Sequence, residues 1–173
     1  TADIYGFDGN GGFGDAEALL GEVLAADPAL RPRMVLASKG GIMPLLPYDQ
    51  SRGYLSSAID ASLRRMRVEV IDLYQIHRPD ILTHPQELAR TLEDAVAAGK
   101  IRSIGVSNFT QPQIEALAHF MDLPIVSTQP EISPLRIDCF ENGELDQAMR
   151  MGMTPFAWSP LGGGRLLSPA NER

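Results

Sequence analysis

Short, mostly apolar runs alternate along the chain with longer stretches in which apolar residues recur every three or four positions. Runs this short and this continuously apolar are typical of strands that are buried on both faces of a sheet. They are Met34–Ser38, Val70–His77, Ile101–Val106, Ile125–Gln129 and Thr154–Trp158. The residues Thr1–Tyr5 have a similar character, and we expect them to be the last part of a preceding strand.

The longer stretches have the periodicity of amphipathic helices. In the second of them, Leu55, Ile59 and Leu63 recur every four residues. In the third, a proline falls in the first turn and a glycine follows the end, which is where helices accept these residues. The predicted helices are Phe13–Ala26, Ser51–Met66, Pro85–Ala98, Pro112–Phe120 and Leu145–Met151.

Strands that alternate with helices predict a parallel α/β sheet covered by helices. This pattern leaves two architectures open, a doubly wound sheet and a (β/α)8 TIM barrel. Polar side chains stand at or just after the C-terminal end of each successive strand: Tyr5, Lys39, His77, Ser107 with Asn108, Gln129 and Ser159. In a barrel these ends form a ring around one pocket, whereas an open sheet spreads them along a line. The polar residues therefore favour the barrel.

The length of the chain limits how much of such a barrel it can form. A complete barrel needs about 250 residues, and this sequence has 173. We therefore expect a single domain, residues 1–173, that is the central part of a barrel whose N-terminal and C-terminal units are not in this chain. An unclosed sheet would otherwise expose two edges and invite pairing with another chain.

Composition narrows the class of partner. The net charge of −7 repels polyanions, and no basic run with interleaved aromatic residues occurs, so we expect no nucleic-acid partner. No apolar stretch approaches the roughly 18 residues that a membrane span needs, so we expect no membrane partner. The single cysteine, Cys139, excludes an internal disulfide and suits a reducing compartment, which predicts a cytoplasmic location. The sequence gives no indication of oligomeric state.

Three residues at successive strand ends could carry chemistry together. Taken singly, Tyr5 could be a half-buried packing residue, Lys39 could extend its ammonium to solvent, and His77 could be an ordinary rim residue. Hydride reduction of a carbonyl needs a proton donor at the oxygen where negative charge develops. A phenol is a weak acid unless a nearby cation stabilises the phenolate, and an imidazole can hydrogen-bond the same oxygen. The three side chains therefore suit a proton donor (Tyr5), a cation that makes the phenol more acidic (Lys39) and a hydrogen-bonding group that orients the carbonyl (His77).

The other histidines and the cysteine do not form a recognisable metal-binding or nucleophilic pattern. His84 and His119 stand before and on predicted helices, without metal-ligand spacing to one another or to Cys139. We therefore assign no metal site. Cys139 has no neighbouring histidine, so we do not expect it to be a nucleophile.

Five segments together resemble the aldo-keto reductase superfamily, in the family's order and approximate spacing. They are Ala2–Gly6, Lys39–Gly41, Asp72–His77, Gly99–Phe109 and Ser159–Arg165. The wording of the last two is most similar to bacterial general oxidoreductases of this superfamily. The resemblance implies that the chain runs from the end of the second barrel strand through the seventh strand and its following loop. It also implies an NAD(P)H-dependent reductase of small-molecule carbonyls, with NADP(H) in preference to NAD(H).

The resemblance assigns a role to each strand-end residue. By it, Tyr5 is the general acid, Lys39 makes that phenol a stronger acid, and His77 positions the carbonyl. Ser107, Asn108 and Gln129 would hold the nicotinamide carboxamide, and Trp158 would stack on the nicotinamide where most members have tyrosine. The cofactor-binding segment that follows would contain Ser159, Pro160, Leu161, Gly164 and Arg165.

Two departures and one alternative accompany the resemblance. The family's catalytic aspartate would fall just before Thr1, and the segment that binds the adenosine 2′-phosphate would follow the last visible strand.

The loop Ile42–Tyr54 is the visible candidate for a substrate mouth, and its Pro, Leu and Tyr content suggests a hydrophobic or aromatic carbonyl. The alternative function is a regulatory module of the same fold, resembling potassium-channel β-subunits, that binds the cofactor with little turnover.

Overall fold

The computed structural model describes residues 1–44 and 48–167. Five parallel strands form one sheet in the order β1-β2-β3-β4-β5, so each strand pairs with its neighbours in sequence. A doubly wound sheet reverses its strand order at a switch point, and this sheet does not. The strands are β1 (Ala37–Gly40), β2 (Ile71–Ile76), β3 (Ile101–Ser107), β4 (Ile125–Gln129) and β5 (Thr154–Pro155).

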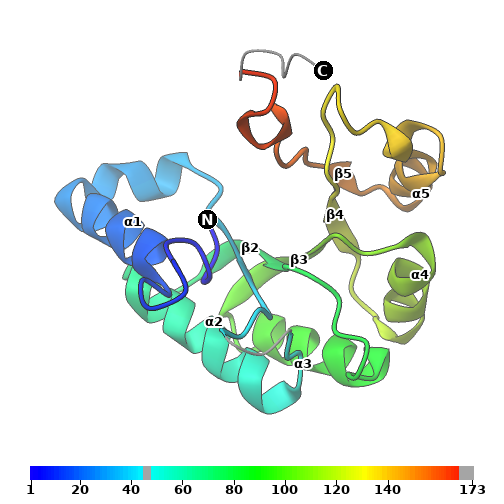
Figure 1. The fold of residues 1–173 in the computed structure, drawn as a ribbon. Coiled ribbons are helices and arrows are strands. Elements are labelled where there is room, and N and C mark those ends of the chain that lie inside the picture. The colour runs from blue at the N-terminus through cyan, green and yellow to red at the C-terminus, as the bar shows by residue number, and fades with distance from the viewer. Residues whose placement is uncertain (45–47, 168–173) are drawn as a thin grey trace.

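Helices follow the strands and lie along the outer side of the sheet, as Figure 1 shows. The α-helices are α1 (Asp15–Ala26), α2 (Arg52–Met66), α3 (Pro85–Ala97), α4 (Gln111–Phe120) and α5 (Glu144–Met151). Three 3-10 turns, which the apolar pattern did not predict, are η1 (Pro28–Arg33), η2 (Asp138–Phe140) and η3 (Gly162–Gly164). This architecture confirms the predicted (β/α)8 class, and the described residues supply five of its strands.

The core lies between the sheet and the helices. All six residues of β2 are buried, as a central strand of a parallel sheet requires. Tyr74, Ile76 and Ile104 pack there against apolar residues of α2, α3 and α4. The polar residues lie at or just after the C-terminal ends of these strands.

Helix starts follow from local capping. The Ser51 hydroxyl accepts a hydrogen bond from the amide of Tyr54 at the start of α2. At the start of α4, Thr110 and Gln113 form a reciprocal capping box. At the start of α3, His84 accepts from the amide of Gln86, which accounts for this histidine without any catalytic role.

The predicted strand at Thr1–Tyr5 is wrong in detail. The terminal amino group of Thr1 and the amide of Asp3 do donate to the carbonyls of Ala37 and Lys39, both at 3.0 Å, so these residues lie alongside β1. It then turns at once, because the amide of Tyr5 bonds back to the carbonyl of Ala2. Tyr5 is therefore placed by a turn.

Two other strands differ from the prediction by more than one residue at an end, whereas β2 and β3 differ by one residue at most at either end. The first full strand is Ala37–Gly40, not Met34–Ser38, because the amide of Leu36 is taken by the Asp72 carboxylate at 2.8 Å. Val35 is consequently exposed, and Lys39 lies inside the strand. The last strand contains only Thr154–Pro155, although Trp158 still pairs with Glu131 as an isolated parallel bridge beyond it.

Candidate active site

A cavity of about 330 Å³ lies at the C-terminal ends of the strands. Its lining residues come from the turn before α1 and from or just after β1, β2, β3, β4 and β5. They are Tyr5, Lys39, His77, Arg78, Ser107, Asn108, Gln129, Trp158 and Ser159. The structure therefore brings eight residues predicted from sequence into one cavity, together with Arg78, which was not predicted.

Tyr5, Lys39 and His77 converge at one side of this cavity. The Lys39 ammonium nitrogen is 4.9 Å from the centroid of the Tyr5 ring. The rings of Tyr5 and His77 meet edge to face, with centroids 5.6 Å apart and an interplanar angle of 86°. Lys39 also donates to the carbonyl of Thr1 at 3.1 Å, which ties the strand to the turn that carries Tyr5. A phenol, an ammonium and an imidazole thus share one small space.

His77 is held as a neutral imidazole. Burial lowers its pKa to about 4, and the positive charges of Lys39 and Arg78 add to this effect. Its Nδ1 atom is buried and has no hydrogen-bond partner among the described residues. A neutral imidazole offers one donor and one acceptor, so this ring can hydrogen-bond a carbonyl oxygen without adding a charge.

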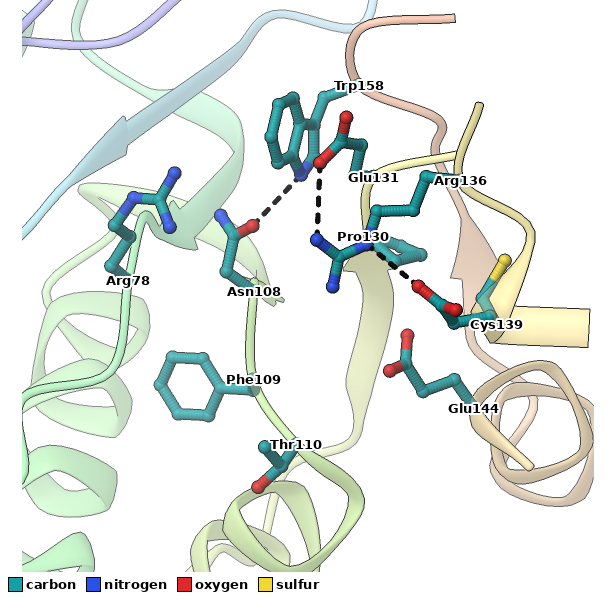
Figure 2. Close-up of a pocket in the computed structure, with 11 residues that line it drawn as sticks. Arg78, Asn108, Phe109, Thr110, Pro130, Glu131, Arg136, Cys139, Glu144 and Trp158 are labelled. Carbon is teal, nitrogen blue, oxygen red and sulfur yellow. Dashed lines mark hydrogen bonds and ion pairs between the residues drawn. The ribbon is translucent and has the colours of Figure 1, made fainter. Parts of the chain in front are cut away.

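Asn108 joins three strand ends to Trp158. Its backbone is left-handed, with φ of 61°, a conformation that asparagine tolerates better than most residues. Its side-chain amide donates to the carbonyl of His77 and to the Ser107 hydroxyl, each at 3.0 Å. Its side-chain oxygen accepts from the indole nitrogen of Trp158 at 2.9 Å, as Figure 2 shows. The indole is thereby fixed as one wall of the cavity.

The cavity also has the chemistry that a nicotinamide ring needs. The side-chain oxygen of Gln129 is buried and lacks a partner among the described residues, so it can accept from a carboxamide. The Ser107 hydroxyl is oriented by the carbonyl of Gln129, to which it donates at 2.9 Å. Trp158 offers a half-buried aromatic face beside them. These residues fit a bound nicotinamide.

The predicted cofactor-binding loop lies only partly at the cavity. Ser159 lines the cavity, whereas Pro160, Leu161, Gly164 and Arg165 do not. Gly164 is left-handed with φ of 87°, and its amide donates to the carbonyl of Leu161 at 3.2 Å within the same loop. The Arg165 guanidinium donates to the carbonyl of Gly162 at 2.8 Å and lies 3.9 Å from Glu131. Arg165 therefore folds onto its own loop.

A second cavity of about 330 Å³ adjoins the first and shares Arg78, Asn108 and Trp158 with it (Figure 2). The Arg78 guanidinium lies 6.0 Å from the centroid of the Trp158 ring. The only sequence signal for Arg78 was its place directly after His77. Cys139 also lines this second cavity, and burial raises the pKa of its thiol, so the nucleophilic thiolate is disfavoured.

The predicted substrate loop and the expectations about metal sites and membrane spans concern residues beyond this cavity. The loop Ile42–Tyr54 includes residues 45–47, which lie outside the described residues; the Tyr54 hydroxyl donates to the carbonyl of Ile42 at 3.1 Å. Within residues 1–44 and 48–167, no group of three or more His, Cys, Asp or Glu residues is arranged to hold a metal ion. Over the same residues, no helix has the length and apolarity to cross a membrane.

The sequence matches the aldo/keto reductase family over residues 1–173. It is similar to 6-dehydroglucose reductase of Novosphingobium aromaticivorans, with 73% identity over 100% of this chain and 57% of that protein. It is also similar to 6-dehydroglucose reductase of Agrobacterium fabrum, with 39% identity over 98% of this chain and 58% of that protein.

The fold is likewise similar to that of solved structures. The glycerol dehydrogenase of Gluconobacter oxydans superposes with a TM-score of 0.86 and 30% identity, covering 100% of this chain and 52% of that one. The chain thus spans somewhat more than half the length of these relatives.

Proposed function

The chain belongs to the aldo/keto reductase family, and from this premise we propose that the protein reduces aldehydes or ketones to alcohols, with Tyr5 as proton donor. The observation that carries the proposal is the convergence of Tyr5, Lys39 and His77 on one cavity that also contains acceptors for a nicotinamide. The cofactor is a nicotinamide dinucleotide, with NADP(H) preferred to NAD(H). We expect the reaction to take place in the cytoplasm.

The cofactor, when bound at Ser107, Asn108, Gln129 and Trp158, supplies the hydride. The chain's own residues then manage the oxygen of the substrate. The neutral imidazole of His77 orients the carbonyl by a hydrogen bond to its oxygen. As the carbonyl π electrons move to the oxygen, the Tyr5 hydroxyl transfers its proton there and the new O–H bond forms.

The phenolate left on Tyr5 must be stabilised and reprotonated. The Lys39 ammonium, 4.9 Å from the centre of the ring, supplies the favourable charge. Tyr5 is 43% exposed, so water can return the proton after the alcohol leaves. Burial of Lys39 strengthens its effect, because charges interact more strongly away from bulk water.

We propose a polar aldehyde, such as a sugar oxidised to the aldehyde, as substrate. The supporting relatives are named 6-dehydroglucose reductase. The cavity lining supports the same class, because Arg78, His77 and Asn108 offer donors and acceptors suited to hydroxyl groups. A polar lining does not favour the hydrophobic or aromatic carbonyl that the loop composition suggested.

The test uses the full-length protein and measures oxidation of NADPH, and separately NADH, with glucose 6-aldehyde, glyceraldehyde and benzaldehyde. Tyr5→Phe should remove turnover while cofactor affinity, measured by calorimetry, stays within about twofold. Tyr74→Phe is the matched control, because that hydroxyl is buried in the core and has no hydrogen-bond partner among the described residues. Undiminished turnover in Tyr5→Phe would refute the proposed proton donor. Cofactor binding without turnover in the unaltered protein would instead indicate a binding module.

A further inference from the structure

Glu17 is a fully buried acid that the mechanism above does not use. Its side chain has no exposed surface, although it lies in the first turns of α1. One carboxylate oxygen accepts from the Ser38 hydroxyl in β1. The other accepts from the Arg65 guanidinium of α2, at 2.7 Å from Nε and 2.6 Å from the terminal nitrogen. The carboxylate therefore joins a helix, a strand and a second helix at one point.

The helix turn that carries Glu17 also holds the turn that carries Tyr5. The amide of Ala16 donates to the carbonyl of Tyr5 at 3.2 Å, and the amide of Gly14 donates to the carbonyl of Asp3 at 2.7 Å. Arg65 packs directly against Gly14, where any Cβ would overlap its side chain. The start of α1 is thus fixed on one side by Arg65 and on the other by the Tyr5 turn.

The strand side of the same carboxylate leads to Lys39. Ser38, which donates to Glu17, is the residue directly before Lys39 in β1. Lys39 in turn accepts from the amide of Asp3 through its own carbonyl, at 3.0 Å. The Glu17 carboxylate is therefore bonded to β1 directly before Lys39, and it lies on the helix whose first turn bonds the turn that carries Tyr5.

We infer that Glu17, with Arg65 and Ser38, is a positioning residue that sets the Tyr5 phenol against the Lys39 ammonium for proton transfer. The inference rests on the proposed function of Tyr5. It predicts that loosening the carboxylate impairs the chemical step more than cofactor binding, because the residues that fit the nicotinamide lie on β3 and β4 and just after β5.

A second buried acid, Asp3, lies beside this cluster but does not share the bond to Arg65. Asp3 is buried, and neither of its carboxylate oxygens has a partner among the described residues. Burial raises the pKa of Asp3 to about 7, and the negative charge of Glu17 adds to the rise. Among the described residues, Arg65 is the cation that bonds within this cluster, and it is paired with Glu17. Asp3 contributes to the turn through its backbone instead.

The test compares Glu17→Gln and Ser38→Ala in the full-length protein. Glu17→Gln keeps the shape and removes the charge; kcat should fall about 10- to 100-fold, the effect of displacing a reacting group by roughly 1 Å. Ser38→Ala keeps the ion pair and removes one hydrogen bond, with a smaller loss of about 3- to 10-fold. In both, KM for the cofactor should stay within about twofold, and the deuterium isotope effect on kcat should rise as hydride transfer becomes rate-limiting.

Matched controls separate positioning from folding. Glu115→Gln breaks an exposed pair, at 2.9 Å, between Glu115 of α4 and Arg150 of α5, and should leave kcat unchanged. Arg65→Lys keeps the charge beside Glu17 and should retain more activity than Arg65→Met. If Glu17→Gln or Ser38→Ala is folded, by circular dichroism, and turns over normally, the positioning role is wrong while Tyr5→Phe still tests the function. If Tyr5→Phe itself stays active, both ideas fail together.

Discussion

Asp72 offers a quantitative test of how the base of the sheet is held. Its carboxylate accepts from the amide of Leu36 at 2.8 Å and pairs with Arg31 at 2.8 Å and Arg102 at 2.6 Å. The Asp72 side chain is 10% exposed and that of Arg31 23%, whereas Arg102 is 65% exposed. The first two contacts therefore act in a mostly desolvated place, and the third is screened by water.

We expect Asp72→Asn to lower the free energy of unfolding by about 2 kcal/mol at pH 7. The amide oxygen of asparagine can keep the bond to Leu36, so the loss is that of charge. Hydrogen bonds to charged groups exceed neutral ones by about 1 kcal/mol each, which applies to Leu36 and Arg31. The exposed Arg102 adds only a few tenths of a kcal/mol after screening.

The pH dependence gives this prediction its sign. Burial alone would raise the pKa of Asp72, but the hydrogen bonds from Arg31 and Leu36 and the two positive charges outweigh it and lower the pKa. A lowered pKa in the folded state means stability that is present above the unfolded value of about 3.9 and is lost as the pH falls through the folded value. The difference between the wild type and Asp72→Asn should therefore shrink below about pH 4.

Urea denaturation of both proteins, followed by circular dichroism from pH 7 downward, measures this difference. Asp94→Asn, in an exposed pair with Arg52, is the control and should change stability little at any pH. A difference for Asp72→Asn that is absent at pH 7, or undiminished in acid, would refute the assignment of the stability to the Asp72 charge.

Three further predictions concern the site and the sheet. His77 should remain neutral by NMR from pH 8 to about 5, because its pKa is lowered to about 4. Its contribution to the free energy of unfolding is present above the unfolded pKa and is lost as the pH falls from about 6.5 through 4. A His77 titration near pH 6.5 would contradict this prediction. Gly105→Ala should lower the free energy of unfolding, measured by urea denaturation, by about 3 kcal/mol or more. The reason is that a Cβ at this position would overlap the Ser127 hydroxyl and lie 3.2 Å from the Ser127 carbonyl oxygen. A loss under about 1 kcal/mol would show that the two strands can move apart to make room. Trp158→Phe keeps an aromatic face but loses the bond to Asn108, so calorimetry should show NADPH binding weakened about 3- to 10-fold, and unchanged affinity would mean that the indole nitrogen does not fix the wall.

The helices and the central strands could be predicted from sequence because their periodicity and caps are local. β4 was predicted residue for residue as Ile125–Gln129, and α2 began one residue after its predicted start. The errors have non-local causes. β1 is shifted because the Asp72 carboxylate, 36 residues away, takes the amide of Leu36, and no periodicity within Met34–Ser38 could reveal that.

The candidate site divides in the same way. Parallel strands put their C-terminal ends on one edge, so the sequence could place Lys39, His77 and Gln129 near one another. It could not show that Arg78 turns into the cavity, or that Arg165 folds back onto its own loop. These outcomes depend on packing partners rather than on position along a strand.

By itself, then, the sequence determined the order of the strands and helices and roughly where each one ends, because apolar periodicity and apolar length fix each element locally. Only the tertiary structure decided which of their residues meet, because contacts between distant segments set the final geometry. Glu17 is the clearest case: it lies on a helix with nothing in the local pattern to mark it, yet it bonds both Ser38 and Arg65. Burial of its charge is possible only once three elements have packed together.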